Sequence, residues 1–246
     1  MKDKTTSTGQ VEISVILPSY NEASLMENTV EKVIGAIEEI TPSYEIIIAQ
    51  DGSTDGGEKV GDSLACRFPF VTHLYSKKRL GRGAALKNAF KNSHGSIMVY
   101  MDMDLATDLR CLRSLVDAIA VEKYDFAVGS RMLPESMVER SLRRQLASRF
   151  YNLLVRIMLG SKIKDHQCGF KAFGRQPTLL ILDEVAARHW FFDTEILVRA
   201  ARKDYRIKEL PVCWKSDGKT KVNSVRDTYR MGRSVFELWW HLRKGQ

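Results

Sequence analysis

The sequence predicts an α/β fold, a mostly parallel sheet flanked by helices, and three observations carry this prediction. The chain of 246 residues is 44% apolar and 28% charged, a composition that supports one large domain or two small ones. Between residues 11 and 131, short apolar runs alternate four times with segments whose apolar residues recur at helical spacing. Polar or turn-forming residues end these runs. Repeated strand–helix alternation gives parallel strands with helices on both faces.

The elements of this first part are expected in a regular order. Residues 11–17 form a strand that Pro18 ends, and a capping-box pattern at 24–27 begins a helix that reaches about residue 40. The expected elements that follow are a strand at 44–49, a helix at 55–67, a strand at 71–75, a helix from 81–83 to about 93, a strand at 97–101, a helix through Leu112 and Ile119, and a strand that ends at 127–129.

After Arg131 the pattern changes to two amphipathic helices with basic residues around their apolar faces, at 141–160 and about 227–244. The apolar residues that share one face of the first helix are Leu142, Leu146, Phe150, Leu153 and Ile157. The second helix carries the tandem pair Trp239-Trp240. Basic amphipathic helices with Trp and Leu suit an anionic membrane interface, and packing on the sheet or against another subunit is the alternative.

Charge is unevenly distributed along the chain, whose net charge is +8. Residues 1–130 hold 14 lysines and arginines against 18 acids, whereas residues 131–246 hold 24 against 12. A basic second half indicates an anionic partner, which is a phosphate, a membrane surface or nucleic acid. No nucleic-acid partner is expected, because the sequence contains no helix-turn-helix, zinc or RNP pattern.

The sequence also bears on the compartment. No apolar run approaches the roughly 18–20 residues of a membrane span, and Met1 to Gln10 lack a signal-peptide hydrophobic region. The four cysteines form no C-x-x-C pair, which disfavours a zinc or redox site. We therefore expect a cytoplasmic protein, or one that binds peripherally to the cytosolic face of a membrane.

Two carboxylates, Asp102 and Asp104, directly follow the apolar run 97–101. Carboxylates this close repel each other unless a cation lies between them. Mg²⁺ or Mn²⁺, which prefer oxygen ligands and usually also hold substrate phosphates, fit this pattern, and a solvated acidic turn is the alternative. Tyr20, Glu22 and Asp51 also lie at or just past strand ends, so they should converge with the two acids at one sheet edge. This convergence favours a ligand site.

Four segments occur in one order at suitable spacing and together resemble the large inverting glycosyltransferase family 2, which has the Rossmann-like GT-A fold. They are Ile-Leu-Pro-Ser-Tyr-Asn-Glu at 16–22, Asp-Gly-Ser-Thr-Asp at 51–55, Gly-Arg-Gly-Ala-Ala at 81–85 and Met-Asp-Met-Asp at 101–104. Residues 165–173 and 190–195 look like the polyprenyl-phosphate branch. That branch includes dolichyl-phosphate mannose synthase and dolichyl-phosphate β-glucosyltransferase, and the likeness extends to about residue 230.

The resemblance implies a domain organisation. Residues 1–10 are expected to be a disordered tail, and residues 11–225 a GT-A catalytic domain. Within that domain, 11–131 would be the nucleotide-sugar half and 132–225 the acceptor half. Residues 226–246 would form the C-terminal amphipathic interface helix.

The resemblance also assigns roles to individual residues. The positions that match the nucleotide-sugar site are Pro18, Tyr20, Glu22, Asp51 and Asp102. Asp102 and Asp104 match the metal and diphosphate positions, and Arg131 matches an arginine near the acceptor phosphate, with Arg143 and Arg144 as helpers. A basic residue on a loop over the diphosphate is expected at Lys221 or Arg226, with Arg226 preferred.

The implied reaction is the metal-dependent, inverting transfer of one hexose from UDP-glucose or GDP-mannose to a polyprenyl (dolichyl-type) phosphate. Mannose synthases of this type commonly have Gln where this chain has Ala106, which tilts the donor toward UDP-glucose. The same fold acting on a soluble saccharide or protein acceptor is the alternative. A membrane-embedded partner chain is also compatible with the sequence.

Three further acids are ambiguous. Asp165 is a candidate base or acceptor-orienting residue and is grouped with Asp104 and Arg131 as catalytic, whereas a structural pair with an arginine is the alternative. Asp193 and Glu195 lie in a Trp/Phe-rich segment that begins a helix, where acids complement the helix dipole. A capping role is therefore at least as consistent with their position as a catalytic one.

Overall fold

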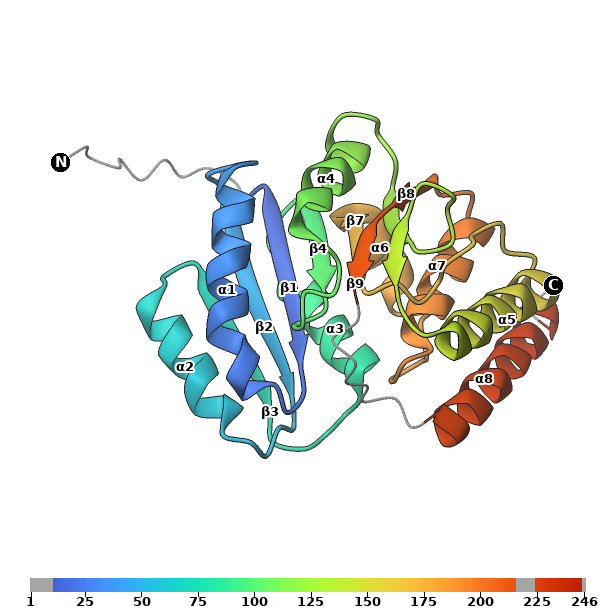
Figure 1. The fold of residues 1–246 in the computed structure, drawn as a ribbon, viewed down its shortest axis with the longest axis horizontal. Coiled ribbons are helices and arrows are strands. Elements are labelled where there is room, and N and C mark those ends of the chain that lie inside the picture. The colour runs from blue at the N-terminus through green and yellow to red at the C-terminus, as the bar shows by residue number, and fades with distance from the viewer. Residues whose placement is uncertain (1–10, 216–223, 245–246) are drawn as a thin grey trace.

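The computed structural model describes residues 11–215 and 224–244, with the backbone alone described for 224–229. The tail expected at residues 1–10 lies outside the described residues. A seven-stranded sheet in the order β3-β2-β1-β4-β7-β5-β8 forms the centre (Figure 1). Its strands are β1 Ile13–Ser19, β2 Tyr44–Asp51, β3 Val71–Ser76, β4 Ile97–Met101, β5 Phe126–Ser130, β7 Phe170–Gly174 and β8 Ile207–Pro211.

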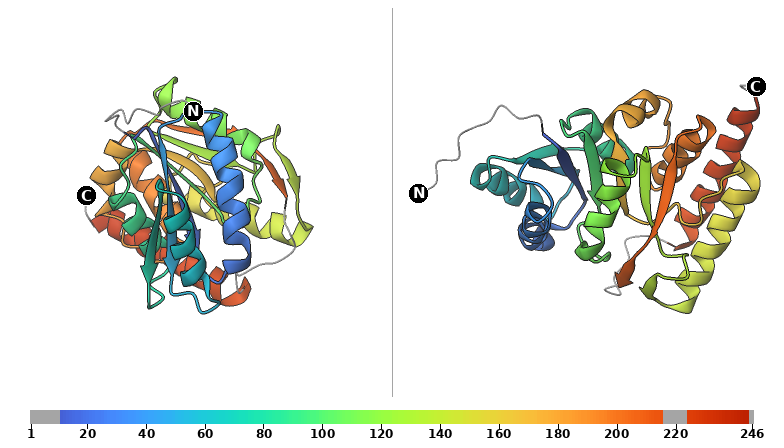
Figure 2. Two further views of the ribbon diagram at one scale, coloured as in Figure 1. Left: turned by 90° about the vertical axis from the view of Figure 1, so that its left-hand side faces the viewer. Right: turned by 90° about the horizontal axis from the view of Figure 1, so that it is seen from above.

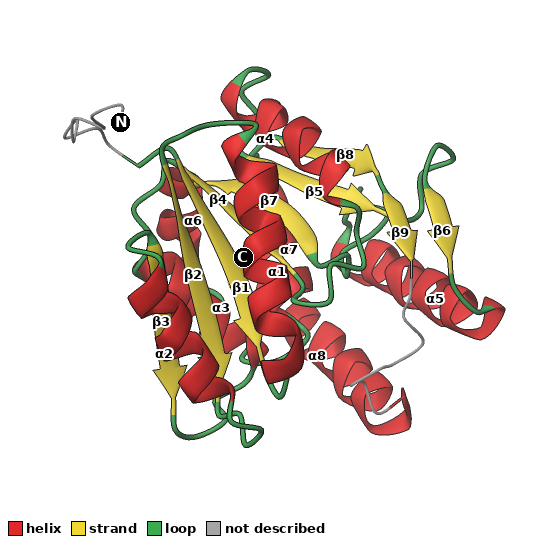
Figure 3. Ribbon diagram, turned by 60° about the vertical axis from the view of Figure 1, so that its left-hand side comes forward, coloured by secondary structure: helices red, strands yellow, loops and turns green. Residues whose placement is uncertain are grey.

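The remaining elements are eight α-helices, one 3-10 turn and a second, two-stranded sheet within the described residues. The helices are α1 Ala23–Glu38, α2 Gly57–Arg67, α3 Arg82–Lys91, α4 Leu112–Ala120, α5 Leu142–Leu159, α6 Arg175–Leu182, α7 Phe192–Arg202 and α8 Ser224–Lys244. The 3-10 turn is η1 Leu109–Cys111, and β6 Met137–Glu139 pairs with β9 Cys213–Lys215. Figure 3 shows this short pair near the β8 end of the twisted main sheet.

The large sheet is mostly parallel, as expected. β1 pairs in parallel with β2 and β4, β2 with β3, and β5 with β8. The exception is β7, which inserts antiparallel between β4 and β5. The chain reaches β7 only after α5, so the middle of the sheet joins the first half of the sequence to the second.

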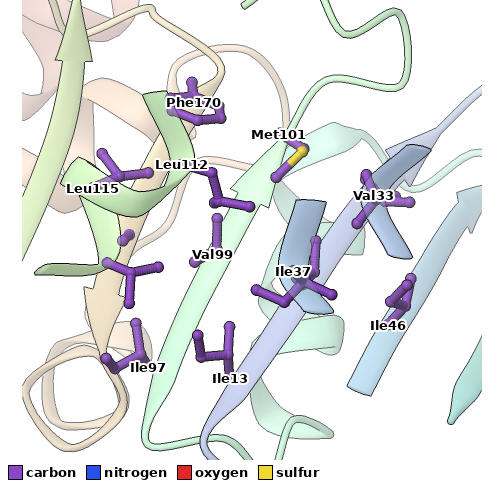
Figure 4. Close-up of a cluster of buried hydrophobic side chains, with 14 of the residues drawn as sticks. Ile13, Val33, Ile37, Ile46, Ile97, Val99, Met101, Leu112, Leu115 and Phe170 are labelled. Atoms are coloured by element: carbon purple, nitrogen blue, oxygen red, sulfur yellow. The ribbon is translucent and has the colours of Figure 1, made fainter. Parts of the chain in front are cut away.

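Both faces of the sheet are buried, because successive strand residues point to opposite sides. Val15 and Leu17 pack in a cluster with α1 and α4, which Figure 4 shows around Val99 and Met101 of β4. Ile16 points the other way, into a second cluster with α3, α6 and α7. This double burial explains why the strands are continuous apolar runs.

A third cluster joins α5, α7 and α8 through Val155, Leu159, Val198, Val235 and Leu238. Figure 2 shows α5 and α8 side by side at one end of the molecule. The apolar stripe predicted on α5 does not take part in this packing. Its residues are exposed by 50–75% of their surface, and they are Leu142, Leu146, Phe150, Leu153 and Ile157. The alternative that this stripe packs on the sheet is therefore wrong. No helix in the described part of the chain is long and apolar enough to cross a membrane.

Candidate active site

Asp51 ends β2 and is only 4% exposed. Its carboxylate accepts hydrogen bonds from the backbone N–H groups of Leu80 (2.6 Å) and Gly81 (2.8 Å), which fasten the loop after β3 to the sheet edge. The same loop carries Arg79, whose guanidinium lies 3.7 Å from the ring centroid of Tyr20. Asp51 and Tyr20, predicted from two separate segments, are therefore linked through one loop.

Pro18 and Glu22 flank this position along the chain. Pro18 is buried inside β1, beside Ala49 of β2. Glu22 immediately precedes α1, and its charge interacts with Arg82, the first residue of α3. The structure therefore brings Glu22 into the electrostatic environment of the acids that follow β4.

Asp102 follows β4, and its side chain contacts Arg82 and the backbone of Gly169. Nη2 of Arg82 lies 2.5 Å from Oδ1 of Asp102. A Cβ atom at Gly169 would lie 2.0 Å from Oδ2 of Asp102, so only glycine leaves room for the carboxylate there. The Asp102 N–H donates to the Gly169 carbonyl at 3.1 Å, which ties the end of β4 to the segment before β7.

Asp104 is exposed, and its Oδ1 accepts from the Ala106 N–H at 3.1 Å. The two acids offer the carboxylate oxygens that Mg²⁺ and Mn²⁺ prefer. The guanidinium beside Asp102 shows that a positive charge is accommodated there, so the residues fit a cation. Within residues 11–215 and 230–244, no three His, Cys, Asp or Glu side chains gather as a metal site. A bound ion would therefore need further ligands from the substrate or water.

Arg131 and Asp165 form a buried ion pair. Nε and Nη2 of Arg131 lie 2.7 and 2.9 Å from the two oxygens of Asp165, which is fully buried. Burial alone would raise the pKa of Asp165, but the charge and hydrogen bonds of Arg131 hold that pKa far below its usual range. A carboxylate held this way is a poor proton acceptor, so the structure favours pairing with arginine over the role of base.

Arg140, which the sequence analysis does not single out, lies near this pair. Its Nε and Nη2 are buried and have no hydrogen-bond partner among the described residues. Burial, and then the charge of Arg131, lowers the pKa of Arg140 to about 10, with Arg149 adding to the effect. Arg131 also interacts with Asp102, so Arg131 lies between the acidic edge and Arg140 in the network of charges. These two buried donors need a partner from outside the described residues, which an anion or a water molecule can supply.

The other predicted basic residues have different positions. Arg143 is exposed and Arg144 is half-buried, both in the first turn of α5. Lys221 lies outside the described residues. Arg226 belongs to α8, but its side chain is not among those described. The predicted cation over the diphosphate therefore stays a prediction.

The side chains of Asp193 and Glu195 have different partners. Glu195 accepts from the backbone N–H groups of Ala186 (3.1 Å) and Ala187 (2.8 Å), so it holds the turn before α7. Asp193 instead contacts the fully buried Lys171, with Nζ 2.7 Å from Oδ1. Lys171 is a second residue that sequence reasoning missed. Its signal was a lone lysine as the second residue of an otherwise apolar strand, where burial requires a partner.

A family model described as glycosyl transferase family 2 matches residues 14–180. Glycosyltransferase AglD of Haloferax volcanii is 46% identical over 234 residues, which cover 94% of this chain but only 38% of AglD. The dolichyl-phosphate β-glucosyltransferase of Saccharomyces cerevisiae is 30% identical over 247 residues, covering 92% of this chain and 73% of that protein. Its namesake in Dictyostelium discoideum is 29% identical, with the same two coverages.

Solved structures confirm the expected GT-A fold. Glucosyl-3-phosphoglycerate synthase of Mycobacterium tuberculosis, solved with Mn²⁺ and UDP, superposes with a TM-score of 0.67 at 18% identity over 94% of this chain and 80% of that one. The mannosyltransferase PcManGT of Pyrobaculum calidifontis, solved with GDP-Man and Mn²⁺, gives 0.58 at 22% identity, covering 92% and 61%.

Proposed function

This chain belongs to glycosyl transferase family 2 and is a glycosyltransferase, and from this premise we propose that it transfers a single hexose to a polyprenyl phosphate of the dolichyl type. The names of the relatives in yeast and Dictyostelium support this acceptor and a glucosyl donor. Ala106 also favours UDP-glucose over GDP-mannose. The observation that carries the proposal is Arg140, whose buried donors lack a partner beside the Arg131–Asp165 pair.

The acidic edge would bind the donor. Asp51, Tyr20, Pro18 and Glu22 would hold the nucleoside, as expected from the sequence. Asp102 and Asp104 would hold Mg²⁺ or Mn²⁺, which supplies positive charge to the departing diphosphate. Mn²⁺ in the two solved neighbours is consistent with a divalent ion at this edge.

The arginines would bind the acceptor. A guanidinium presents planar donors that match phosphate oxygens, and it stays charged when buried. Asp165 orients Arg131, whereas Nε and Nη2 of Arg140 remain available to donate hydrogen bonds to a phosphate. Arg143 and Arg144 at the start of α5 would add positive charge near the proposed acceptor-phosphate site.

The proposed reaction is one inverting displacement. A phosphate oxygen of the acceptor attacks the anomeric carbon, and the bond from that carbon to the donor diphosphate breaks on the opposite face. The acceptor is already an anion, so no strong base is required to activate it. The low pKa of Asp165 is therefore compatible with this chemistry, in which Asp165 positions Arg131.

The exposed stripe on α5 supports peripheral membrane binding, because the acceptor's lipid tail stays in a bilayer. Phe236 and Trp240 of α8 are 53% and 48% exposed and add apolar surface at the same end of the molecule. Arginines on both helices suit anionic headgroups. We place the protein on the cytosolic face, and a membrane-embedded partner chain is the other candidate to cover the stripe.

One experiment tests the reaction. Purified protein is incubated with polyprenyl phosphate and a panel of radiolabelled nucleotide sugars, with and without Mn²⁺, and the organic phase is counted. The proposal expects label from UDP-glucose in the organic phase, and only with the metal. Label that stays in water on a saccharide or protein acceptor, at the same rate without lipid, would instead favour the alternative of a soluble acceptor.

A further inference from the structure

Arg82 lies between two carboxylates at the start of α3. Its Nη2 contacts Oδ1 of Asp102 at 2.5 Å, and its Nε lies 4.0 Å from Oδ2 of Asp193. The guanidinium carbon is 5.4 Å from the ring centroid of Trp190 and 5.8 Å from that of Tyr100. The side chain is only 15% exposed, so this guanidinium has a built environment rather than a surface position.

The glycines on either side fix the backbone of Arg82. A Cβ at Gly81, where φ is +106°, would lie 2.2 Å from the carbonyl oxygen of Arg188. A Cβ at Gly83 would lie 2.6 Å from Cβ of Phe192. The start of α3 is therefore pressed against the segment that leads into α7. We therefore expect Arg82 to change its partner by rotation of its side chain.

The buried Lys171 contacts Asp193 through the carboxylate oxygen that does not face Arg82. Its Nζ contacts Oδ1 of Asp193 at 2.7 Å and the Tyr100 hydroxyl at 2.8 Å, and it also donates to the Cys168 carbonyl. Lys171 holds one oxygen of Asp193 and leaves Oδ2 facing Arg82. Nε of Arg82 is buried and has no hydrogen-bond partner among the described residues. Basic and acidic side chains therefore alternate from Lys171 through Asp193 and Arg82 to Asp102, and Nε of Arg82 has one hydrogen bond still to make.

Burial lowers the pKa of Arg82, but Asp102 and then Asp193 more than offset this effect, so the guanidinium stays charged. A divalent cation bound to Oδ1 of Asp102 would repel the guanidinium that lies 2.5 Å from the same oxygen. A metal ion that binds this oxygen therefore competes with Arg82. The nearest available carboxylate oxygen on the other side is Oδ2 of Asp193.

We propose that Arg82 is a positioning residue that serves as the counter-ion of Asp102 when no divalent ion is bound and turns to Asp193 when one binds. This inference rests on the proposed metal site. Because Arg82 competes for Asp102, the chain should bind the ion weakly alone. The donor's diphosphate adds negative charge and should strengthen the binding, so metal and nucleotide enter together.

The test is Mn²⁺ binding, measured by the electron paramagnetic resonance signal of free Mn²⁺ with and without UDP. Arg82→Gln should bind Mn²⁺ about tenfold more tightly than the wild type without UDP, and UDP should improve its binding correspondingly less. Arg82→Lys keeps the charge and should behave as the wild type. Lys87→Gln, one turn further along α3 with its Nζ on the Val185 carbonyl, is the matched control and should change nothing.

Two results would overturn the inference in different ways. In the first, the wild type binds Mn²⁺ in the presence of UDP, but without UDP Arg82→Gln and the wild type have the same affinity for Mn²⁺. Arg82 then does not compete for Asp102, and only this inference fails. If the wild type binds no Mn²⁺ even with UDP, the proposed metal site fails and the inference with it. Thermal unfolding of each variant checks that a change in affinity does not reflect loss of the fold.

Discussion

The acids at the sheet edge before Arg131 already have partners within the chain, whereas the half-buried Arg140, which follows Arg131, has buried donors with no partner among the described residues. Asp51 is held by two backbone N–H groups and Asp102 by Arg82. Arg140 has buried donors without a partner in the described part of the chain. We interpret the difference to mean that a metal ion at the acidic edge competes with Arg82, while Arg140 has donors that an added anion can satisfy.

The largest expected effect tests the acidic edge. Asp104→Asn should lower transfer by about a thousandfold or more, because the diphosphate loses charge stabilisation as it departs. The fold should persist, since Asp104 is exposed. Initial rates at saturating Mn²⁺ measure the loss of transfer, and circular dichroism measures whether the fold persists. Glu31→Gln, an exposed acid on α1, is the control, and equal rates for Asp104→Asn and the wild type would refute the metal assignment.

Arg131→Ala tests whether the buried ion pair between Arg131 and Asp165 also stabilises the fold. It would leave Asp165 fully buried without its cation, which typically costs about 3–5 kcal/mol of unfolding free energy. Urea unfolding measures this loss. A variant as stable as the wild type would show that the pair is not structural.

His166 tests the opposite case, a buried group in the same half that is already satisfied. Nδ1 lies 2.8 Å from Oδ1 of Asn152 and Nε2 2.8 Å from Oγ of Ser161. Burial lowers the pKa of His166 to about 4, below its unfolded value near 6.5, so the neutral form is favoured in the fold.

The stabilising contribution is therefore complete above about pH 6.5 and is lost as the pH falls toward 4, by about 3 kcal/mol in total. Unfolding free energy measured across this range should fall less steeply for His166→Gln. Identical slopes would show that His166 titrates normally.

Arg140→Gln separates binding from stability. It should raise KM for polyprenyl phosphate about 10- to 100-fold, because one charged hydrogen-bonding group to the phosphate is lost. Donor binding should stay unchanged, and the midpoint of thermal unfolding should not fall, since no internal partner is removed and burial already disfavours the charge of Arg140. Arg149→Gln, on the exposed side of α5, is the comparison. An unchanged KM for lipid would remove Arg140 from the acceptor site.

The smallest expected effect concerns the exposed stripe on α5. Replacing Leu146 and Phe150 by Ser should weaken binding to anionic vesicles about tenfold, because each side chain enters the interface only in part and contributes a fraction of the about 1.5–3 kcal/mol of full burial. Co-sedimentation measures the bound fraction. Val121→Ser, which is 69% exposed at the end of α4, is the control. Equal losses in both variants would mean that the stripe does not contact the bilayer.

The first half could be predicted closely, because its strands and helices have clear periods and its acids follow strand ends. The second half could not. β7 is five residues long with a lysine as its second residue, and its antiparallel place between β4 and β5 depends on contacts distant in sequence. The α5 helix was predictable, but not which face packs, since Val155 and Leu159 make a second apolar face.

Site residues follow the same division. Asp51 and Asp102 are identified by motifs, whereas Arg140 is one of many arginines in a basic stretch and stands out only through its unpartnered donors. The charge chain through Lys171 and Asp193 joins residues 22 positions apart to Arg82 in the first half. No local pattern specifies such a pairing.

The most direct test is a crystal structure with UDP, Mn²⁺ and a short polyprenyl phosphate, recorded at the manganese absorption edge. We expect one anomalous peak between Asp102 and Asp104 and the acceptor phosphate on Arg131 and Arg140. Manganese away from both acids, or a phosphate that contacts neither arginine, would contradict the division of this molecule into a donor half and an acceptor half.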